Sequence, residues 1–398
     1  FALIVSPHAA FSMVIADITG TFSSYSLTVI PLFVFMGQVA FHAGISKRLF
    51  RSAYAWIGHL PGGLAMATVG ACAGFGAICG SGPATAATMT SVALPEMRRY
   101  RYSDELASGT IAAGGGLGML IPPSVVFIVY ALMTEQSIGS LFLAGIIPGI
   151  MIVGLFCVLI GIRCKMRNEL GPPGPKSSWK TRFRELTGVL ETLILFIFVM
   201  GGMFLGLFTP IEAAAVGAGG SLVIALVKRK LTWTVLKQIL LETVRTSAMV
   251  FFIVTGAVIF GRFLAVSQIP FAVAEWFTNL PLPGFLTMFL IIIFFLIAGC
   301  FIDALALILL TIPIFYPVIT ELGFNPIWFG VMVVVITQMG VITPPVGVNV
   351  YVVSGIERDI PLQSIFRGAL PFLFMLVLAA IILIIFPQIC LWLPNLSG

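Results

Sequence analysis

The chain has 398 residues, of which 59% are hydrophobic and 9% are charged. A water-soluble domain usually carries about 25% charged residues, so most of this apolar surface needs lipid as its solvent. The net charge of +6 does not indicate a nucleic-acid partner, because the basic residues lie in short loops between apolar runs. We therefore expect a protein embedded in a lipid bilayer.

Several apolar runs approach the length of about 20 residues that a helix needs to span a bilayer. These runs lie at 188–208, 246–261, 283–298 and 370–386. They do not alternate apolar and polar residues as the strands of a membrane barrel do, so they predict helices. The expected fold class is an all-α, polytopic membrane protein. Because Phe1 stands inside an apolar stretch, we also expect a first helix that lacks its beginning.

The basic residues predict the topology. All of them except Arg262 fall in clusters, whereas loops such as 17–25 and 318–325 contain none. The positive-inside rule places the clusters in the cytoplasm. Segment 62–95 then starts and ends inside, and segment 284–317 starts and ends outside. Each is expected to be a re-entrant helical hairpin, and the two hairpins are expected to open in opposite directions.

The two halves of the sequence resemble each other at a nearly constant offset. Glycines and prolines recur in the same order: Gly37 and Gly256, Pro95 and Pro313, Gly118-x-x-x-Pro122-Pro123 and Gly340-x-x-x-Pro344-Pro345, Gly145-x-x-Pro148 and Gly368-x-x-Pro371. Inverted repeats with interrupted helices are typical of secondary transporters. We expect a first repeat at 1–164, a flexible cytoplasmic linker at 165–187 and a second repeat at 188–398. Within these, 44–60 and 232–245 are expected to be interfacial helices and 246–265 a span.

Four breaks should expose backbone groups inside the membrane, at 80–85, 121–124, 299–303 and 343–349. Freed carbonyls are costly in hydrocarbon unless they bind something, and carbonyl and hydroxyl oxygens suit a hard cation such as Na⁺. The expected Na⁺ ligands are Gly80, Ser81, Gly82, Thr85, Pro123, Ser124, Gly299, Asp303, Thr343, Pro345, Gly347 and Asn349. Half-helix N-termini suit an anionic substrate. The expected substrate contacts are Ser81, Pro83, Ser124, Pro345 and Asn349.

Three charged residues stand out singly. Asp303 lies in an apolar hairpin, where a carboxylate is costly, so we expect it to bind the cation, to cap the second hairpin helix, or to do both. Arg262 either attracts an anionic substrate or extends to the outer interface. Glu212, after Thr209-Pro210, is expected to cap a helix. The histidines, His8, His42 and His59, are far from the breaks in sequence and are assigned no chemistry.

Several segments together resemble the large membrane subunit of tripartite ATP-independent periplasmic (TRAP) transporters, of the DctM and SiaM kind. These segments are 58–65, 80–86, 94–97, 117–124, 142–149, 209–218 and 343–347. The resemblance implies a Na⁺-driven carrier of the ion-transporter superfamily that works by an elevator motion. It also implies a bacterial inner-membrane location with a periplasmic C-terminus. The implied cargo is an organic acid anion, such as a C4-dicarboxylate or a sialic acid.

The implied partners are a small membrane subunit and a periplasmic substrate-binding protein. One alternative is a stand-alone Na⁺/carboxylate symporter of the same superfamily. A second is an intramembrane serine hydrolase with Ser81 as nucleophile, although the sequence around Ser81 is not Gly-x-Ser-x-Gly. The phosphate-binding sequence Gly-x-x-x-x-Gly-Lys-Ser/Thr is absent. We therefore expect a transporter without enzymatic activity, with Na⁺ as the coupling ion and no nucleotide.

Overall fold

The structure is a computed structural model that describes residues 6–279 and 283–397, and its regular elements there are helices. Within the described residues, six helices are long and apolar enough to cross a membrane, or up to eight if each of two bent pairs counts as one span. The expected all-α, polytopic membrane fold is confirmed.

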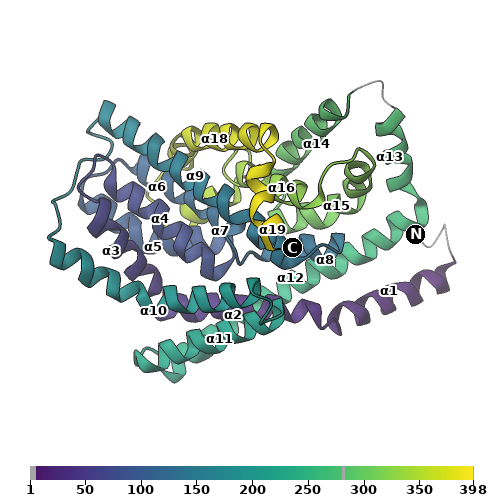
Figure 1. The fold of residues 1–398 in the computed structure, drawn as a ribbon, viewed down its shortest axis with the longest axis horizontal. Helices are drawn as coiled ribbons and strands as arrows, with labels where there is room; N and C mark the ends of the chain where they lie inside the picture. The colour runs from purple at the N-terminus through teal and green to yellow at the C-terminus, as the bar shows by residue number, and fades with distance from the viewer. Residues whose placement is uncertain (1–5, 280–282, 398) are drawn as a thin grey trace.

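One group of helices, which we call the outer group, lies along one long side of the molecule (Figure 1). Its members are α1 (Pro7–Phe22), α2 (Val29–His42), α10 (Trp179–Phe204), α11 (Pro210–Val227) and α12 (Trp233–Ser267). The α11 helix begins with a capping box, in which Thr209 and Glu212 each bind the other's backbone amide. The predicted capping role of Glu212 is therefore confirmed.

The other helices repeat one order twice: a connecting helix, a two-helix hairpin, a broken helix and a long helix. The first copy comprises α3 (Ile45–Ile57), α4 (Gly63–Cys79), α5 (Gly82–Arg99), α6 (Asp104–Gly115), α7 (Leu117–Leu120), α8 (Val125–Thr134) and α9 (Ile138–Met166). The second comprises α13 (Ile269–Asn279), α14 (Gly284–Gly299), α15 (Ala304–Glu321), α16 (Pro326–Gly340), α17 (Val348–Ile356) and α18 (Leu362–Ile385), and α19 (Gln388–Ser397) follows.

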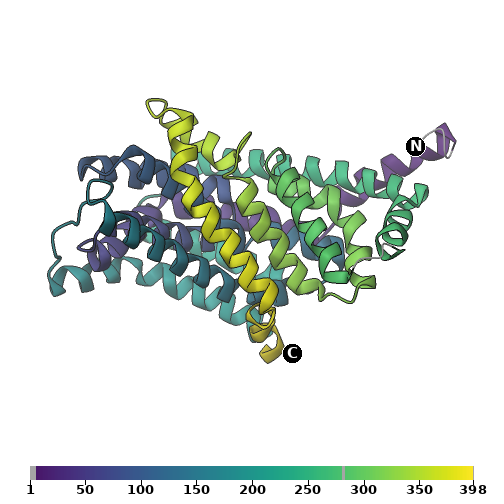
Figure 2. The same cartoon turned by 90° about the horizontal axis from the view of Figure 1, so that it is seen from above.

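The two hairpins approach the middle of the molecule from opposite ends. In Figure 1, α4 and α5 lie on the left and α14 and α15 on the right, with α7 and α16 between them. Figure 2 keeps this separation and shows α18, in yellow, crossing the molecule obliquely. The opposed hairpins and the two broken helices agree with the inverted repeat expected from the glycine and proline pattern.

Local chemistry explains where the hairpins turn. The α4 helix ends at Gly80, whose φ of +64° is disfavoured for residues with a side chain. Ser81 then caps α5, and Pro83 in the first turn has no amide hydrogen to leave unpaired. In the second hairpin, a carboxylate oxygen of Asp303 accepts a hydrogen bond from the amide of Leu305 at 3.0 Å. Asp303 therefore caps α15, as the sequence suggested.

Three expected segment boundaries are wrong. The irregular part of the predicted linker is only 167–178, because α9 continues to Met166 and α10 begins at Trp179. This stretch is also tied to the protein: the Leu170 and Gly171 carbonyls accept hydrogen bonds from the amides of Ser103 and Gly62. The predicted interfacial helix at 232–245 and the span at 246–265 are one continuous helix, α12, since no glycine or proline separates them.

The predicted outer loop at 17–25 is also wrong, because α1 continues to Phe22 and then meets α2 at an angle of 52°. Asp17 therefore lies inside a helix, with its side chain only 4% exposed. The Arg262 guanidinium contacts both oxygens of this carboxylate, and its Nε lies 3.2 Å from each. Arg262 thus joins α12 to α1, and neither role expected for it from the sequence includes this pairing.

We expect Arg262→Met to lower the free energy of unfolding by about 2 kcal/mol. The variant protein is destabilised because the Asp17 carboxylate would stay buried without its cation. The loss of stability is smaller than for a fully buried ion pair, because the Arg262 guanidinium is half-exposed. Adding Asp17→Asn should restore much of the stability, whereas Arg245→Met, at an exposed position of the same helix, should change little. Thermal unfolding in detergent of Arg262→Met, Asp17→Asn, the double variant and Arg245→Met would measure the coupling, and additive losses in the double variant would contradict it.

Candidate functional site

The tips of the two hairpins meet at one cavity of about 240 Å³, which we call the central cavity. Residues 80–84 line it from the first hairpin, and 303–305 line it from the second. The broken helix of the first repeat contributes Met119, Val125 and Val126. The outer group closes the remaining side with Val34 of α2 and with Thr246, Met249 and Val250 of α12. The cavity therefore lies where both repeats meet the outer group.

Three helix N-termini border the central cavity. The α5 helix begins at Gly82, α8 at Val125 and α15 at Ala304, and all three residues line the cavity. The unpaired amides and the partial positive charge of a helix N-terminus attract anions. Asp303 places a negative charge in the same space. The arrangement suits an anion and a cation bound close together.

Oxygen atoms gather between the first hairpin tip and its broken helix. The buried Thr85 hydroxyl donates a hydrogen bond to the Ser81 carbonyl at 2.7 Å. A Cβ on Gly118 would lie 2.6 Å from the Thr85 hydroxyl and 2.8 Å from the Ser81 carbonyl, so only glycine allows this approach. A Cβ on Gly80 would likewise lie 2.8 Å from the Pro123 carbonyl. These oxygens are of the kind that binds a hard cation.

Ser124 also belongs to the first junction, at the break before α8. Its hydroxyl donates to the Met119 carbonyl and accepts from the Phe127 amide, so it caps α8 across the break. The Gly80 carbonyl accepts a hydrogen bond from the Val125 amide at 3.2 Å, which ties the hairpin tip to the broken helix. Ser124 is fully buried and does not line the central cavity.

The second hairpin tip has a similar junction with its own broken helix. The Cys300 carbonyl accepts a hydrogen bond from the Val346 amide at 3.2 Å, and Gly299 packs directly against the backbone of Gly340. The Thr343 hydroxyl donates to the Met339 carbonyl at 2.6 Å, as Ser124 donates to that of Met119. Each junction therefore has one backbone hydrogen bond between the hairpin tip and the broken helix, while the side-chain contacts of the two junctions differ.

The expected site residues divide into three sets. Those that line the central cavity are Gly80, Ser81, Gly82, Pro83 and Asp303. Those at the first junction but outside the cavity lining are Thr85, Pro123 and Ser124. Those at or beyond the second junction, and also outside the lining, are Gly299, Thr343, Pro345, Gly347 and Asn349.

Two of the expected substrate contacts in the second repeat lie elsewhere. Asn349 is fully buried, and its amide nitrogen donates to the Ala112 carbonyl at 3.0 Å, which joins α17 to α6. Pro345 is exposed, whereas its counterpart Pro123 is buried. The pseudo-symmetry of the sequence therefore does not extend to equal surroundings of the two breaks.

A second cavity, of about 310 Å³, adjoins the central one, and we call it the polar vestibule. The two cavities share Val34, Ser81, Ala84 and Thr246. Polar residues that sequence reasoning missed line the vestibule: Gln38, His42, Thr88, Ser91, Gln238, Glu242 and Thr246. A usable signal was the spacing of Ser81, Ala84, Thr88 and Ser91, which places them on one face of α5. His42, which was assigned no chemistry because it is far from the breaks in sequence, also lines this vestibule.

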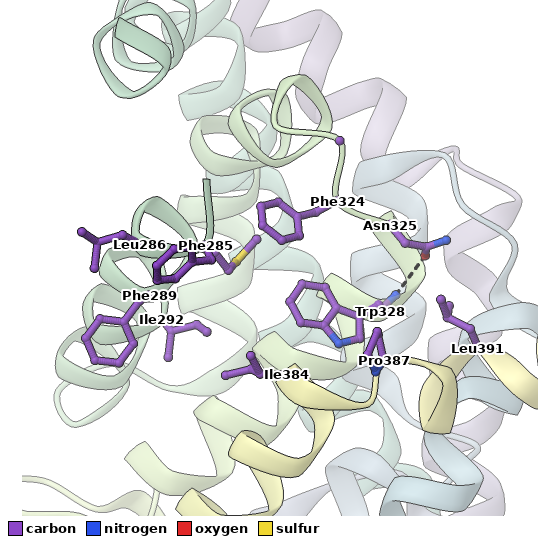
Figure 3. Close-up of a pocket in the computed structure, with 12 residues that line it drawn as sticks. Phe285, Leu286, Phe289, Ile292, Phe324, Asn325, Trp328, Ile384, Pro387 and Leu391 are labelled. Carbon is purple, nitrogen blue, oxygen red and sulfur yellow. Dashed lines mark hydrogen bonds between the residues drawn. The ribbon is translucent and has the colours of Figure 1, made fainter. Parts of the chain in front are cut away.

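A further cavity, of about 540 Å³, is lined mainly by apolar side chains of α14, α16 and the α18–α19 region. Figure 3 shows Phe285, Phe289 and Ile384 around it. The polar groups at its edge are already paired, since the Trp328 indole donates to the Leu383 carbonyl at 2.9 Å. Its lining does not gather the oxygens or helix N-termini of the central cavity.

In the described residues, no group of three or more His, Cys, Asp or Glu side chains could hold a metal ion. A transition metal prefers such nitrogen, sulfur and carboxylate ligands. The first junction offers oxygen atoms of the kind that an alkali cation binds, namely the Thr85 hydroxyl and the Ser81 and Pro123 carbonyls.

Comparison with known proteins supplies a family. The profile described as "Tripartite ATP-independent periplasmic transporter, DctM component" matches residues 1–389. The C4-dicarboxylate TRAP transporter large permease protein DctM of Pseudomonas aeruginosa is 38% identical over 397 residues, covering 100% of this chain and 92% of that protein. The sialic acid TRAP transporter large permease protein SiaM of Vibrio cholerae is 35% identical over 395 residues, covering 99% and 92%.

The ectoine TRAP transporter large permease protein TeaC of Halomonas elongata is 34% identical over 373 residues, covering 94% of this chain and 87% of that protein. Among solved structures, the YdaH transporter of Alcanivorax borkumensis shares the fold, with a TM-score of 0.67 over 96% of this chain and 88% of that chain at 15% identity. MtrF of Neisseria gonorrhoeae gives a TM-score of 0.58 over 96% and 83% at 13% identity. The chain is a transporter permease and not an enzyme, and it belongs to the DctM family of large TRAP transporter subunits.

Proposed function

We propose that this chain is the large membrane subunit of a Na⁺-coupled transporter that imports an organic acid anion across the bacterial inner membrane. The observation that supports this most is the central cavity, where two opposed hairpin tips and three helix N-termini border one space. Helix N-termini favour the carboxylate of a C4-dicarboxylate or a sialic acid. The cargoes named for the relatives are C4-dicarboxylate, sialic acid and ectoine.

Sodium coupling is proposed from the two junctions between hairpin tips and broken helices. At the first, the Thr85 hydroxyl and the Ser81 carbonyl lie beside the tip, and Asp303 faces the same cavity from the other hairpin. A bound Na⁺ would offset the charge of Asp303 and that of an incoming carboxylate. Binding of the ion and of the anion would then favour each other, which is the requirement for coupled transport.

An elevator motion agrees with the position of the cavities. Hairpin residues form one wall of the central cavity and of the polar vestibule, and α2 and α12 of the outer group form the other. We propose that the hairpins and broken helices move together against the outer group. The vestibule follows α5 from Ser81 to Ser91, towards the basic end at Arg98, and would be the inner release route. This assignment places the C-terminus in the periplasm.

The proposed partners are a small membrane subunit and a periplasmic substrate-binding protein, which the tripartite family name supports. In proteoliposomes that contain all three proteins, we expect uptake of labelled succinate or sialic acid to require an inward Na⁺ gradient. Omitting the binding protein should abolish this uptake. Uptake of free substrate by the chain alone would instead support a stand-alone symporter, and uptake without Na⁺ would contradict the coupling.

A further inference from the structure

A cavity of about 470 Å³ between α3 and α5 collects basic side chains, and we call it the basic pocket. Lys47 and Arg51 of α3 line it together with Arg99 from the last turn of α5. Lys47 and Arg51 are four residues apart, so they lie on the same face of α3. The carboxylate in the lining is that of Glu96, which lies 3.7 Å from Arg99. The basic pocket thus has more cations than anions.

Within the part of the chain that the structure describes, two of these cations, Lys47 and Arg51, differ from Arg98 and Arg163 in having no acidic partner. Arg98 is paired with Asp104 at 2.8 Å and with Glu357 at 3.0 Å, and Arg163 is paired with Glu105. Across residues 6–279 and 283–397, by contrast, no carboxylate forms a salt bridge with Lys47 or Arg51. Two exposed cations that converge with a third on one cavity can bind an anionic group from outside the chain.

Apart from the hydroxyl-bearing Tyr54, Ser91 and Tyr100, the rest of the basic pocket is apolar. Phe50 and Leu64 are buried at its wall, and Val92 and Pro95 of α5 line it as well. The α3 helix combines buried apolar residues, Ile45, Phe50 and Ala55, with the exposed cations Lys47 and Arg51. Such a helix suits the membrane interface, where its cations would be level with the lipid headgroups.

We propose that the basic pocket binds the phosphate headgroup of an anionic phospholipid. The phosphate would lie between Lys47, Arg51 and Arg99, and the start of an acyl chain would pack against Val92 and Pro95. A small soluble anion would use the cations but would leave the apolar wall uncovered. The combination of both surfaces therefore favours a lipid.

The position of the pocket gives the lipid a role in movement. The α3 helix packs on α10 of the outer group and on α4 of the first hairpin, and the pocket lies between α3 and α5. A headgroup held by both α3 and α5 would link the hairpin to the helix that connects it with the outer group. If the proposed elevator motion is correct, anionic lipid would change the transport rate, but the binding itself does not depend on that function.

The test uses the purified full-length chain in detergent, with native mass spectrometry to count retained phosphatidylglycerol or phosphatidylcholine. We expect phosphatidylglycerol to be retained preferentially. Lys47→Gln/Arg51→Gln should weaken its retention by roughly 10- to 30-fold, because each basic residue near an anionic lipid surface adds a similar increment of binding. Lys237→Gln/Arg245→Gln removes the same charge from exposed positions of α12 and should retain the wild-type value.

Equal retention of both lipids, or an equal loss in the α12 control, would overturn the assignment. Inorganic phosphate and succinate are added as competitors, to test whether the pocket binds soluble anions. If either displaces phosphatidylglycerol at millimolar concentration in an Arg51-dependent manner, the pocket is a soluble-anion site and the lipid assignment is wrong. Should the double variant fail to fold, Arg99→Gln replaces it, and unchanged retention in that folded variant would also contradict the proposal. None of these readouts measures transport, so the lipid proposal can be tested even if the uptake experiment contradicts the proposed function.

Discussion

Replacing Asp303 by asparagine is expected to reduce Na⁺-dependent uptake about a hundredfold while the protein remains folded. The amide of asparagine can still accept the hydrogen bond from Leu305 that caps α15, so the hairpin tip keeps its shape. The negative charge that faces the central cavity is lost. Removing one partner of a poorly solvated charge pair costs about 3 kcal/mol, which corresponds to this factor.

Two companion variants separate the charge from the cap. Asp303→Ala removes both and should lower the free energy of unfolding by about 1 kcal/mol in addition to the loss of uptake. Glu321→Gln removes a carboxylate at the exposed far end of the same helix and should transport normally. Initial uptake rates against Na⁺ concentration, together with thermal unfolding, would measure both effects. Wild-type Na⁺ dependence in Asp303→Asn would leave Asp303 with a capping role alone.

The second large effect is expected at Gly368, where α18 crosses α6. A Cβ at this position would overlap the Glu105 carbonyl, and one on Gly109 would overlap the backbone of Gly368. The two backbones are in contact, so no flexible side chain can move to make room. Gly368→Ala should therefore destabilise the protein by about 3 kcal/mol and sharply reduce the amount of folded protein in the membrane.

Gly154→Ala in α9 is the matched control, because a Cβ there meets nothing within 4 Å. Alanine favours a helix by about 1 kcal/mol over glycine, so this change should be neutral or slightly stabilising. The fraction of monodisperse protein after heating, measured by size-exclusion chromatography, would compare the two variants. Equal survival of Gly368→Ala and Gly154→Ala would show that the crossing can relax.

The sequence by itself determined where the hairpins turn and where the two broken helices stop. Glycine frees the backbone and proline restricts it, in both cases through the covalent structure of the residue itself. The breaks at Gly80, Pro123 and Pro345 could therefore be predicted without knowing which helices pack beside them. The same holds for the caps: the Asp303 side chain reaches an amide only two residues away. The prediction that the hairpins open to opposite sides of the membrane came from the positions of basic residues, because the cost of moving charge across lipid acts on each loop separately.

The tertiary structure alone decided which groups meet across the chain. Asp17 and Arg262 are 245 residues apart, and only the packing of α1 on α12 pairs them. Asn349 was expected to bind Na⁺ and substrate, and its amide instead donates to Ala112 in the other repeat, while His42 reaches the polar vestibule because α2 and α5 both line it. Each break depends on the residues at the break itself, so the same glycine and proline pattern gives a break in both halves of the sequence. The surroundings of each break depend on which helices cover it, and the two repeats are covered differently.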